Sequence, residues 1–594
     1  MNVEPAPVSS EKPPNRSSWS RLILGVVAGF VLGSLVSGGY ILYLHGLFVA
    51  FASTPLLVLV LRTLLTVVGL APLFYGLVRL RSIKIRLATE NASRESGLWI
   101  PIGFGAVVIV LIGVYGIASS AALLVFWLTG GIVSAAIVYE NSGQSRRTLA
   151  AYAAIVIALF AMLGFVSLYA PVEASKHITV EKLNGPIDVN GLRRFIPLMT
   201  AYAYASDRIQ IPTHRIYPED SYVYYLGNSS VYNWIIEPEG FWNQLTKSPL
   251  GAVFVYGDEY PPRVKLVARP LEWGLHNKRF RLLFFDTLER RIVMTAGLQY
   301  KPLLEDNIEV LYNGKIYILV PLVTWKRGLL YSLPVLHGYV IVDEDGNIEV
   351  VTGDRLASDP RLQGMPLLPE AVARDWVEAY RYKVGLVGFY LYHNTYVIRD
   401  IGTNPQPYLE QRSDGQLYWV FVAEPPGETY SAKYIIYVET SSTSTPRLLF
   451  YELPEPAIGI SKVESYVKQA HPTYDWGELS IEEPMPTLLN GTLYWKATVT
   501  TKDYRGLVSV DIVNAASGEV ISLQPRRKVT YLDVLHALWS REAVEKPTTG
   551  GLEERIAALE RRVAETIKAL EEIQRELQEL RRLVANSTTG GQEG

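Results

Sequence analysis

Nearly all the long apolar runs of this 594-residue chain lie before Pro171. Several runs there lack charged residues and reach the roughly 20 residues that a helix needs to cross about 30 Å of hydrocarbon. They predict a bundle of five transmembrane helices, at about residues 22–44, 55–78, 98–118, 120–139 and 148–170. A cleaved signal peptide is less favoured, because the first apolar run is too long for one.

Basic residues orient the predicted spans. They precede the first span, follow the second and separate the fourth from the fifth: Lys12, Arg16, Arg21, Arg79, Arg81, Lys84, Arg86, Arg146 and Arg147. The intervening turns at residues 45–46 and 119–120 carry no Lys or Arg. Because basic loops stay in the cytoplasm, we expect a multi-pass protein of the cell membrane. Residues 1–20 would be a disordered cytoplasmic tail, and residues 171–594 would be extracytoplasmic.

Two features of the predicted spans suggest roles beyond anchoring. Small residues recur at every fourth position on one face of the first span: Gly25, Gly29, Gly33 and Ser37. They would let another helix approach closely, either from a second copy or from the same chain. Arg62 is the only charge inside a span, and such a charge can mark an ion path. We favour an outer-interface position for Arg62, because its apolar run is longer than a bilayer is thick.

Residues 171–547 have a different sequence pattern, in which Tyr, Val, Pro and charged residues alternate. Short alternating segments predict strands, at residues 338–343, 433–438 and 507–512 among others. Helical spacing of apolar residues predicts helices at residues 192–206, 369–381 and 460–470. We therefore expect an extracytoplasmic domain that is α+β and rich in strands.

A short pattern, Asn/Asp-Gly-x-Ile/Leu-Tyr-Ile/Trp, occurs three times in this domain, beginning at Asn313, Asp414 and Asn490. Asn-Gly and Asp-Gly supply the positive φ angles of a tight hairpin turn, and the apolar residues that follow form a strand. A second predicted strand follows each copy, and a helix precedes two of them. The pattern predicts a repeated module of helix and antiparallel sheet, over about residues 313–351, 369–451 and 460–523.

The last unit contains Val508-Ser-Val-Asp511, followed by Ser517-Gly-Glu-Val520. In these segments it resembles a PepSY-type module, which typically ends in a Val-x-Val-Asp strand and a Thr/Ser-Gly-Glu-Val turn. The resemblance covers residues 460–523 and extends only loosely to the other units. It implies an extracytoplasmic binding or structural module, a kind that in some proteins is proposed to inhibit peptidases, and it implies no catalytic residue.

The carboxyl-terminal segment carries a separate signal. After a short linker at residues 548–551, apolar residues recur at heptad spacing over residues 552–585. This spacing predicts a coiled coil, followed by a disordered tail at residues 586–594. Its core positions would be Ile556, Leu559, Val563, Leu570, Ile573, Leu577, Leu580 and Val584. It would join copies of the chain in a homo-oligomer or bind an envelope protein partner, unless it is a single helix docked on its own domain.

The sequence contains no motif that identifies catalysis or a cofactor. The absence of Cys excludes thiolate chemistry and Cys-ligated metals, and a net charge of -2 argues against nucleic acid as a partner. Gly-x-Ser-x-Gly, phosphate-loop and His-Glu-x-x-His motifs are absent, and the eight histidines are scattered. The acidic segment from Asp343 to Asn347 lacks the spacing of a calcium loop, so a hairpin turn is favoured. No catalytic, metal or cofactor residue is therefore assigned.

These features together predict a polytopic cell-membrane protein. It would contact membrane lipids and display an extracytoplasmic binding or scaffold domain, in a role in cell-envelope organisation. One alternative is a component of a transporter or channel, which facing polar residues inside the bundle would favour. Another is an extracytoplasmic enzyme or peptidase regulator, which a deep pocket lined by converging acids or His would favour.

Overall fold

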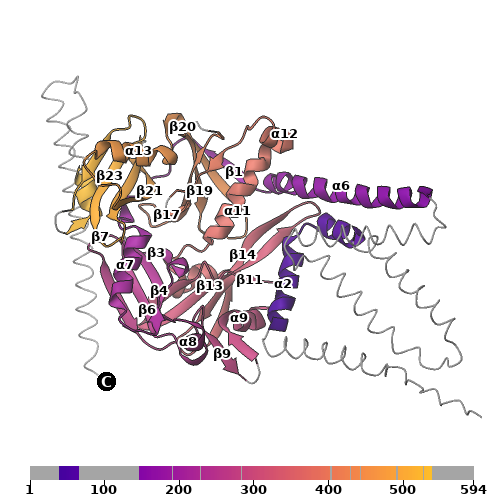
Figure 1. Cartoon of the computed structure of the whole chain (residues 1–594), viewed down its shortest axis with the longest axis horizontal. Coiled ribbons are helices and arrows are strands. Elements are labelled where there is room, and N and C mark those ends of the chain that lie inside the picture. Colours follow the sequence, from indigo (N-terminus) through magenta and orange to yellow (C-terminus); the bar gives the residue numbers. More distant parts are fainter. Residues whose placement is uncertain are drawn as a thin grey trace, which may run out of the picture. The chain divides into compact units, whose positions relative to one another are not determined.

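The computed structural model describes residues 39–65 and 146–537, except 190, 228, 282–283, 402–403, 428–429, 442, 490–491 and 526–527. The chain divides into two compact units, Met1–Tyr531 and Leu532–Gly594. In the described part of the first unit, most residues after α6 belong to β-sheets and the helices that pack on them (Figure 1).

Four antiparallel meanders make up most of this β-rich region, and a helix precedes each one along the chain. The first consists of α7 (Leu198–Arg208) and strands β3 (Tyr222–Leu226), β4 (Ser229–Ile235), β6 (Gly251–Tyr256) and β8 (Arg263–Ala268). The second consists of α9 (Leu288–Ala296) and strands β12 (Ile308–Tyr312), β13 (Lys315–Arg327), β14 (Ser332–Val342) and β15 (Ile348–Thr352).

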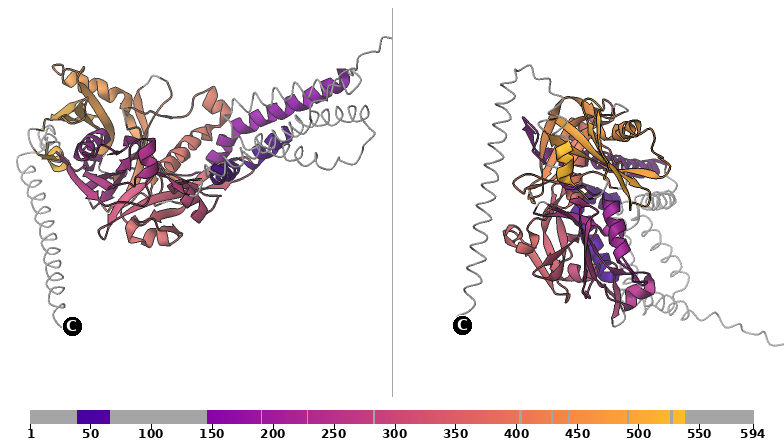
Figure 2. Two further views of the ribbon diagram at one scale, coloured as in Figure 1. Left: turned by 60° about the horizontal axis from the view of Figure 1, so that its bottom comes forward. Right: turned by 90° about the vertical axis from the view of Figure 1, so that its left-hand side faces the viewer.

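The third and fourth meanders follow the same order. The third consists of α11 (Glu370–Tyr380) and strands β17 (Tyr408–Gln411), β18 (Leu417–Glu424), β19 (Ser431–Glu439) and β20 (Arg447–Ile458). The fourth consists of α13 (Ile460–Ala470) and strands β21 (Leu479–Leu489), β22 (Thr492–Thr501), β23 (Leu507–Asn514) and β24 (Val520–Leu523). Two further views show these sheets and their helices (Figure 2).

Shorter elements extend or connect the meanders. They are η2 (Gly191–Arg193), β2 (His214–Arg215), η3 (Pro218–Asp220), β5 (Glu237–Pro238), α8 (Phe241–Thr246), β7 (Glu259–Tyr260), β9 (Lys278–Arg281), β10 (Phe284–Thr287), β11 (Lys301–Pro302), α10 (Arg355–Ser358), η4 (Pro360–Leu362), η5 (Arg381–Val384), α12 (Gly385–Tyr390), β16 (Val397–Ile398) and β25 (Val529–Thr530). The long helix α6 (Arg146–Lys176) leads directly into β1 (Thr179–Leu183), which pairs in parallel with β20. The apolar helix is thereby tied to the sheet of the third meander.

Turn chemistry explains the first strand pair of the repeated pattern. Tyr312 pairs with Lys315, so Asn313 and Gly314 form a two-residue turn, with φ angles of 49° and 76°. Positive φ at both positions is what this hairpin turn requires. Asp414 lies in the turn between β17 and β18. The tyrosines of the three patterns, Tyr317, Tyr418 and Tyr494, lie in β13, β18 and β22.

The third and fourth meanders share one hydrophobic core. α13 buries Ile460, Val463 and Val467, which the helical period places on one face. Trp495 of β22 is fully buried, and its indole nitrogen donates to the carbonyl oxygen of Ile458 at 2.7 Å. Each fully buried aliphatic side chain stabilises the fold by about 1.5–3 kcal/mol before entropy is counted.

The predicted helices at 369–381 and 460–470 coincide with α11 and α13, but the one at 192–206 needs correction. The structure has the short helix η2 there and then α7, which begins at Leu198 after Pro197. The ring of Pro197 disfavours helical geometry for the residue before it, so a helix is not expected to continue through residue 196.

The predicted bundle of five transmembrane helices is wrong. Within the described ranges, one helix is long and apolar enough to cross a membrane, Ala150–Lys176 in α6. A second span exists only if two helices, His45–Ser53 and Leu56–Leu65, count as one despite a bend of 115°. The described fold is instead mainly β-sheet. The predicted spans at 98–118 and 120–139 lie outside the described residues.

The turn predicted after the first span is wrong. Residues taken as a turn, His45 and Gly46, lie inside α2 (Gly39–Ser53). His45 is buried, its Nε2 is 2.8 Å from the carbonyl oxygen of Tyr300, and α2 contacts β13, β14 and α9. Apolar residues that contact a sheet have the same hydropathy as residues that contact lipid, so the sequence alone did not separate the two.

The part of the chain that the structure describes contains no coiled coil. In this part, the helices after α6 are short, whereas a coiled coil needs a second helix along its whole apolar seam. Residues 552–585, with the eight predicted core positions, lie outside the described residues. So do the small residues Gly25, Gly29, Gly33 and Ser37, the linker and both predicted tails.

Candidate functional site

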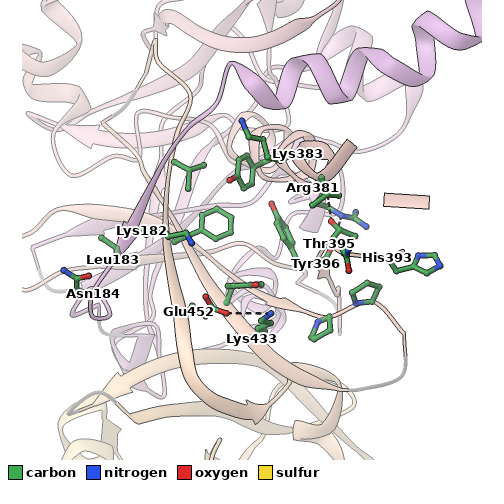
Figure 3. Close-up of a pocket in the computed structure, with 18 residues that line it drawn as sticks. Lys182, Leu183, Asn184, Arg381, Lys383, His393, Thr395, Tyr396, Lys433 and Glu452 are labelled. Atoms are coloured by element: carbon green, nitrogen blue, oxygen red, sulfur yellow. Dashed lines mark hydrogen bonds and ion pairs between the residues drawn. The ribbon is translucent and has the colours of Figure 1, made fainter. Parts of the chain in front are cut away.

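A cavity of about 640 Å³ opens beside the sheet of the third meander (Figure 3). Its wall combines strands β1, β19 and β20 with η5 and the loop at residues 393–396. β1 comes directly after α6, whereas η5 continues α11, so the wall joins segments that are far apart in the sequence.

Strand register places the side chains that line the sheet side of the cavity. Lys182 of β1 is the parallel partner of Phe450 in β20, so both lie on one face of the sheet. Glu452 is two residues further along β20 and shares that face. The register between β19 and β20 shifts between the pairs Ala432–Ala457 and Tyr434–Glu452, and Lys433 lies at this irregularity. Lys433 Nζ lies 3.7 Å from the carboxylate of Glu452.

An aromatic cluster forms the apolar part of the wall. The ring of Phe450 lies 5.3 Å from that of Tyr380, 5.9 Å from that of Tyr396 and 6.1 Å from that of Tyr434, measured between centroids. Their tilted and edge-on geometries are those that aromatic pairs prefer. Tyr396 is buried and its hydroxyl donates to the carbonyl oxygen of Val377 at 2.7 Å. Burial raises the pKa of Tyr396 well above its usual range, so this phenol stays neutral.

The charged part of the wall is predominantly basic. Four cationic side chains, Lys182, Arg381, Lys383 and Lys433, face one acid, Glu452. A hydrogen bond to the side chain of Tyr434 raises the pKa of Lys433, and Glu452 raises it by a smaller amount. Lys433 therefore stays protonated. This excess of positive charge favours an anionic occupant.

Two of the four cations are already engaged. Arg381 pairs with Glu378, and its Nε donates to the carbonyl oxygen of Tyr396 at 2.9 Å. Lys433 pairs with Glu452. Lys182 and Lys383, by contrast, have no ion-pair or hydrogen-bond partner among the side chains that the structure describes, so both ammonium groups are available to a ligand.

The cavity offers recognition rather than an evident reaction centre. The hydroxyl of Thr395 donates to the carbonyl oxygen of Arg381 at 2.9 Å, which occupies it as a donor. Among the described residues, no group of three or more His, Asp or Glu side chains could hold a metal ion. Aromatic faces beside unpaired ammonium groups suit a ligand that joins an apolar or planar part to an acidic group.

A second polar cluster is buried between meanders. Arg194 Nη2 lies 3.1 Å from Glu483 Oε1, and Arg194 Nε donates to the hydroxyl of Tyr232 at 2.9 Å. Lys496 donates to the carbonyl oxygen of Arg194, and Glu410 is buried nearby. Burial raises the pKa of Glu410 well above its usual range and lowers that of Lys496 to about 8. The cluster joins β4, β17, β21 and β22, so we assign it a structural role.

Of the sequence-predicted site residues, Arg62 lies in the described part of the chain, and it does not line this cavity. Arg62 lies in the helix Leu56–Leu65 and is half-buried. His393 lies on the cavity wall, although no sequence motif distinguishes it from the other seven histidines. Asp343 and Asn347 lie in the turn between β14 and β15, where the Asp343 carboxylate accepts the Asn347 backbone N–H at 2.8 Å.

Sequence reasoning missed the cavity because no local motif encodes it. Its cations and aromatic residues come singly from separate strands and turns, and only the pairing of β1 with β20 brings Lys182 to Phe450. The Tyr-rich alternation of β19 was a signal for a strand but not for a site.

Comparisons with known proteins add little. No family model matches the chain, and no curated protein matches it. Among solved structures, an endo-arabinase from Bacteroides thetaiotaomicron VPI-5482 is similar over 56% of this chain and 84% of its own, at 10% identity and a TM-score of 0.15. That neighbour is an enzyme by name, but a TM-score this low supports no inference about the fold or activity of this chain.

Proposed function

We propose that this protein is a membrane-anchored binding protein of the cell envelope. Its β-rich domain binds a ligand that carries an acidic group next to an apolar or planar group, in the cavity between β1, β19, β20 and η5. The observation that carries the proposal is the pair of unpartnered ammonium groups, Lys182 and Lys383, beside the aromatic cluster around Phe450.

The proposed anchor is α6. Several large apolar side chains of this helix are exposed, among them Ile157, Phe165 and Leu168. Exposed apolar surface on this scale is unfavourable in water and favourable in hydrocarbon. Only His177 and Ile178 separate α6 from β1, so an anchored α6 would hold the cavity next to the membrane surface on the extracytoplasmic side.

Binding is preferred to catalysis and transport as the role of the domain. The repeated order of helix and four-stranded meander agrees with the proposal that the units are PepSY-type binding or structural modules. The described cavity wall brings together lysines and aromatic rings but no pair of acids, which a hydrolytic site would favour. A homo-oligomer or an envelope protein partner stays a prediction.

Binding of phenyl phosphate to the full-length protein in detergent tests this function by isothermal titration. Phenyl phosphate combines the two features that the cavity favours, whereas phenol and inorganic phosphate each have one. We expect the phenyl phosphate to bind more tightly than either, and more weakly at high salt, because exposed charges are screened.

A double variant, Lys182→Ala with Lys383→Ala, should weaken phenyl phosphate binding at least severalfold. Lys265→Ala is the matched control, since Lys265 is an exposed strand lysine of the first meander, away from the cavity. Equal affinity of the double variant and the wild type would place binding elsewhere and overturn the assignment of the cavity.

A further inference from the structure

A second surface of the domain is apolar although it faces outward. Five large side chains within nine residues are exposed around α12: Val384, Val387, Tyr390, Leu391 and Tyr392. Leu391 and Tyr392 are the extremes, at 71% and 70% exposure. Single exposed apolar residues need no explanation, but a contiguous group marks a surface that contacts a partner or a membrane.

This segment is held in place by its own packing. The ring of Phe389 stacks on that of Tyr382 at 4.1 Å, and the guanidinium of Arg381 lies 5.6 Å from the same ring. These contacts stabilise the conformation in which Leu391 and Tyr392 are exposed.

Position in the fold indicates what covers the segment. α12 contacts α6, and the two elements lie side by side in Figures 1 and 2. The turn between β13 and β14 also reaches the apolar helices: Leu330 packs against the hydrophobic cluster formed by the helix Leu56–Leu65 and α6, while Leu329 beside it is 60% exposed. Exposed apolar side chains of the domain therefore lie on elements that contact the apolar helices, and α6 itself exposes apolar side chains.

We propose that the segment 384–392 and the turn at Leu329, together called the apolar collar, insert into the interfacial layer of a lipid bilayer. The inference rests on the proposed anchoring by α6. Tyrosines favour the boundary between headgroups and hydrocarbon, where an apolar ring and a polar hydroxyl are both accommodated. Lys383 lies at the edge of the collar, where anionic headgroups would attract it. A lipid surface explains this combination better than a protein groove, because α6 itself requires lipid at the same place.

Single spin labels on the full-length protein test the collar, and the chain allows them because it has no Cys. Leu391→Cys and Leu329→Cys, labelled with a nitroxide and reconstituted in vesicles of phosphatidylcholine and phosphatidylglycerol, should collide with oxygen more than with a water-soluble nickel chelate. Their oxygen-to-nickel collision ratio should be severalfold higher than that of Leu226→Cys. Leu226 is the matched control, an exposed leucine at 57% at the end of β3.

A fourth label separates the collar from the anchor. Phe165→Cys, on an exposed position of α6, should report lipid whether or not the collar inserts. If the Phe165→Cys label is in lipid and the labels at residues 329 and 391 resemble the one at residue 226, the collar proposal is overturned while the anchor stands. If the Phe165→Cys label is also in water, the anchor proposal itself fails. Collar labels shielded from both reagents would identify a protein contact and likewise overturn insertion.

Discussion

Arg194 and Glu483 form a buried ion pair across 289 positions of the sequence, with Nη2 and Oε1 3.1 Å apart. Glu483 Oε1 also accepts the backbone N–H of Leu198 at 2.7 Å and the side-chain amide of Asn404 at 2.8 Å. One carboxylate oxygen therefore links the start of α7, the approach to β17 and the bulged strand β21. The meanders are joined through polar contacts as well as through their apolar core.

Removing one partner of this pair should destabilise the domain strongly. Glu483→Ala leaves the guanidinium of Arg194 buried without its counter-charge, which costs about 3–5 kcal/mol in such pairs. Urea denaturation of the full-length protein in detergent measures the change. The control is Arg505→Ala, which breaks an exposed pair with Asp207 and should have little effect because solvent screens that pair. A similar loss of stability in both variants would show that burial does not determine how much an ion pair contributes to the stability of this domain.

Lys496 should make stability rise with pH in the alkaline range. Burial lowers the pKa of Lys496 from 10.5 to about 8 in the folded state. Between these values the unfolded chain binds a proton that the folded chain does not, so the free energy of unfolding increases as pH rises from 8 to 10.5. The difference amounts to about 3 kcal/mol. Denaturation between pH 8 and 10.5 should show a free energy of unfolding that rises less steeply with pH in Lys496→Met than in the wild type. An unchanged slope would contradict a lowered pKa for Lys496.

Glu237 should make the free energy of unfolding fall as pH rises in the acidic range, opposite to the effect of Lys496. Burial raises the pKa of its carboxyl group from 4.5 to about 7, although the backbone N–H of Leu275 donates to it at 2.5 Å. The folded chain then holds a proton that the unfolded chain has lost, so this group's contribution to stability falls as pH rises from 4.5 to 7 and stays constant above. Glu237→Gln should remove that fall, as measured by thermal unfolding at several pH values. An unchanged fall in the variant would contradict the assignment.

Trp376 should be sensitive to replacement by a smaller aromatic ring that lacks the indole N–H. The side chain is fully buried in α11, and Nε1 donates to the carbonyl oxygen of Pro334 at 2.7 Å. Trp376→Phe keeps an aromatic ring but leaves that carbonyl without its donor, at a cost of about 1–3 kcal/mol. Trp242→Phe, at a position 76% exposed, should change stability by less than about 0.5 kcal/mol. Chemical denaturation of the two variants compares them directly.

The sequence predicted individual turns and helices correctly where the residues of one element determine its conformation. Asn313 and Gly314 identify a hairpin turn because few other residues tolerate positive φ. Val372, Trp376 and Val377 identify α11 because its apolar period is helical. The first meander escaped the repeat pattern because its β3–β4 turn reads Gly227-Asn228, the reverse of the Asn-Gly pair that defined the others.

Long-range features could not be predicted in the same way. The transmembrane prediction treated every apolar run as lipid-facing, whereas α2 contacts strands of the second meander. The cavity depends on the parallel pairing of Lys182 with Phe450, and the buried cluster on the approach of Arg194 to Glu483. None of these residues has an unusual local environment in the sequence, so only the tertiary structure brings them together.

The parallel pairing of β1 with β20 has a mechanical consequence. Five residue pairs, from Thr179 with Arg447 to Leu183 with Tyr451, connect the two strands, and only two residues of slack separate them from α6. A pull on α6 along the direction of β1 therefore loads these pairs together in shear, instead of opening them one after another. Tension in the helix would be delivered to the floor of the cavity, where Lys182 and Phe450 are among the pairs that bear it.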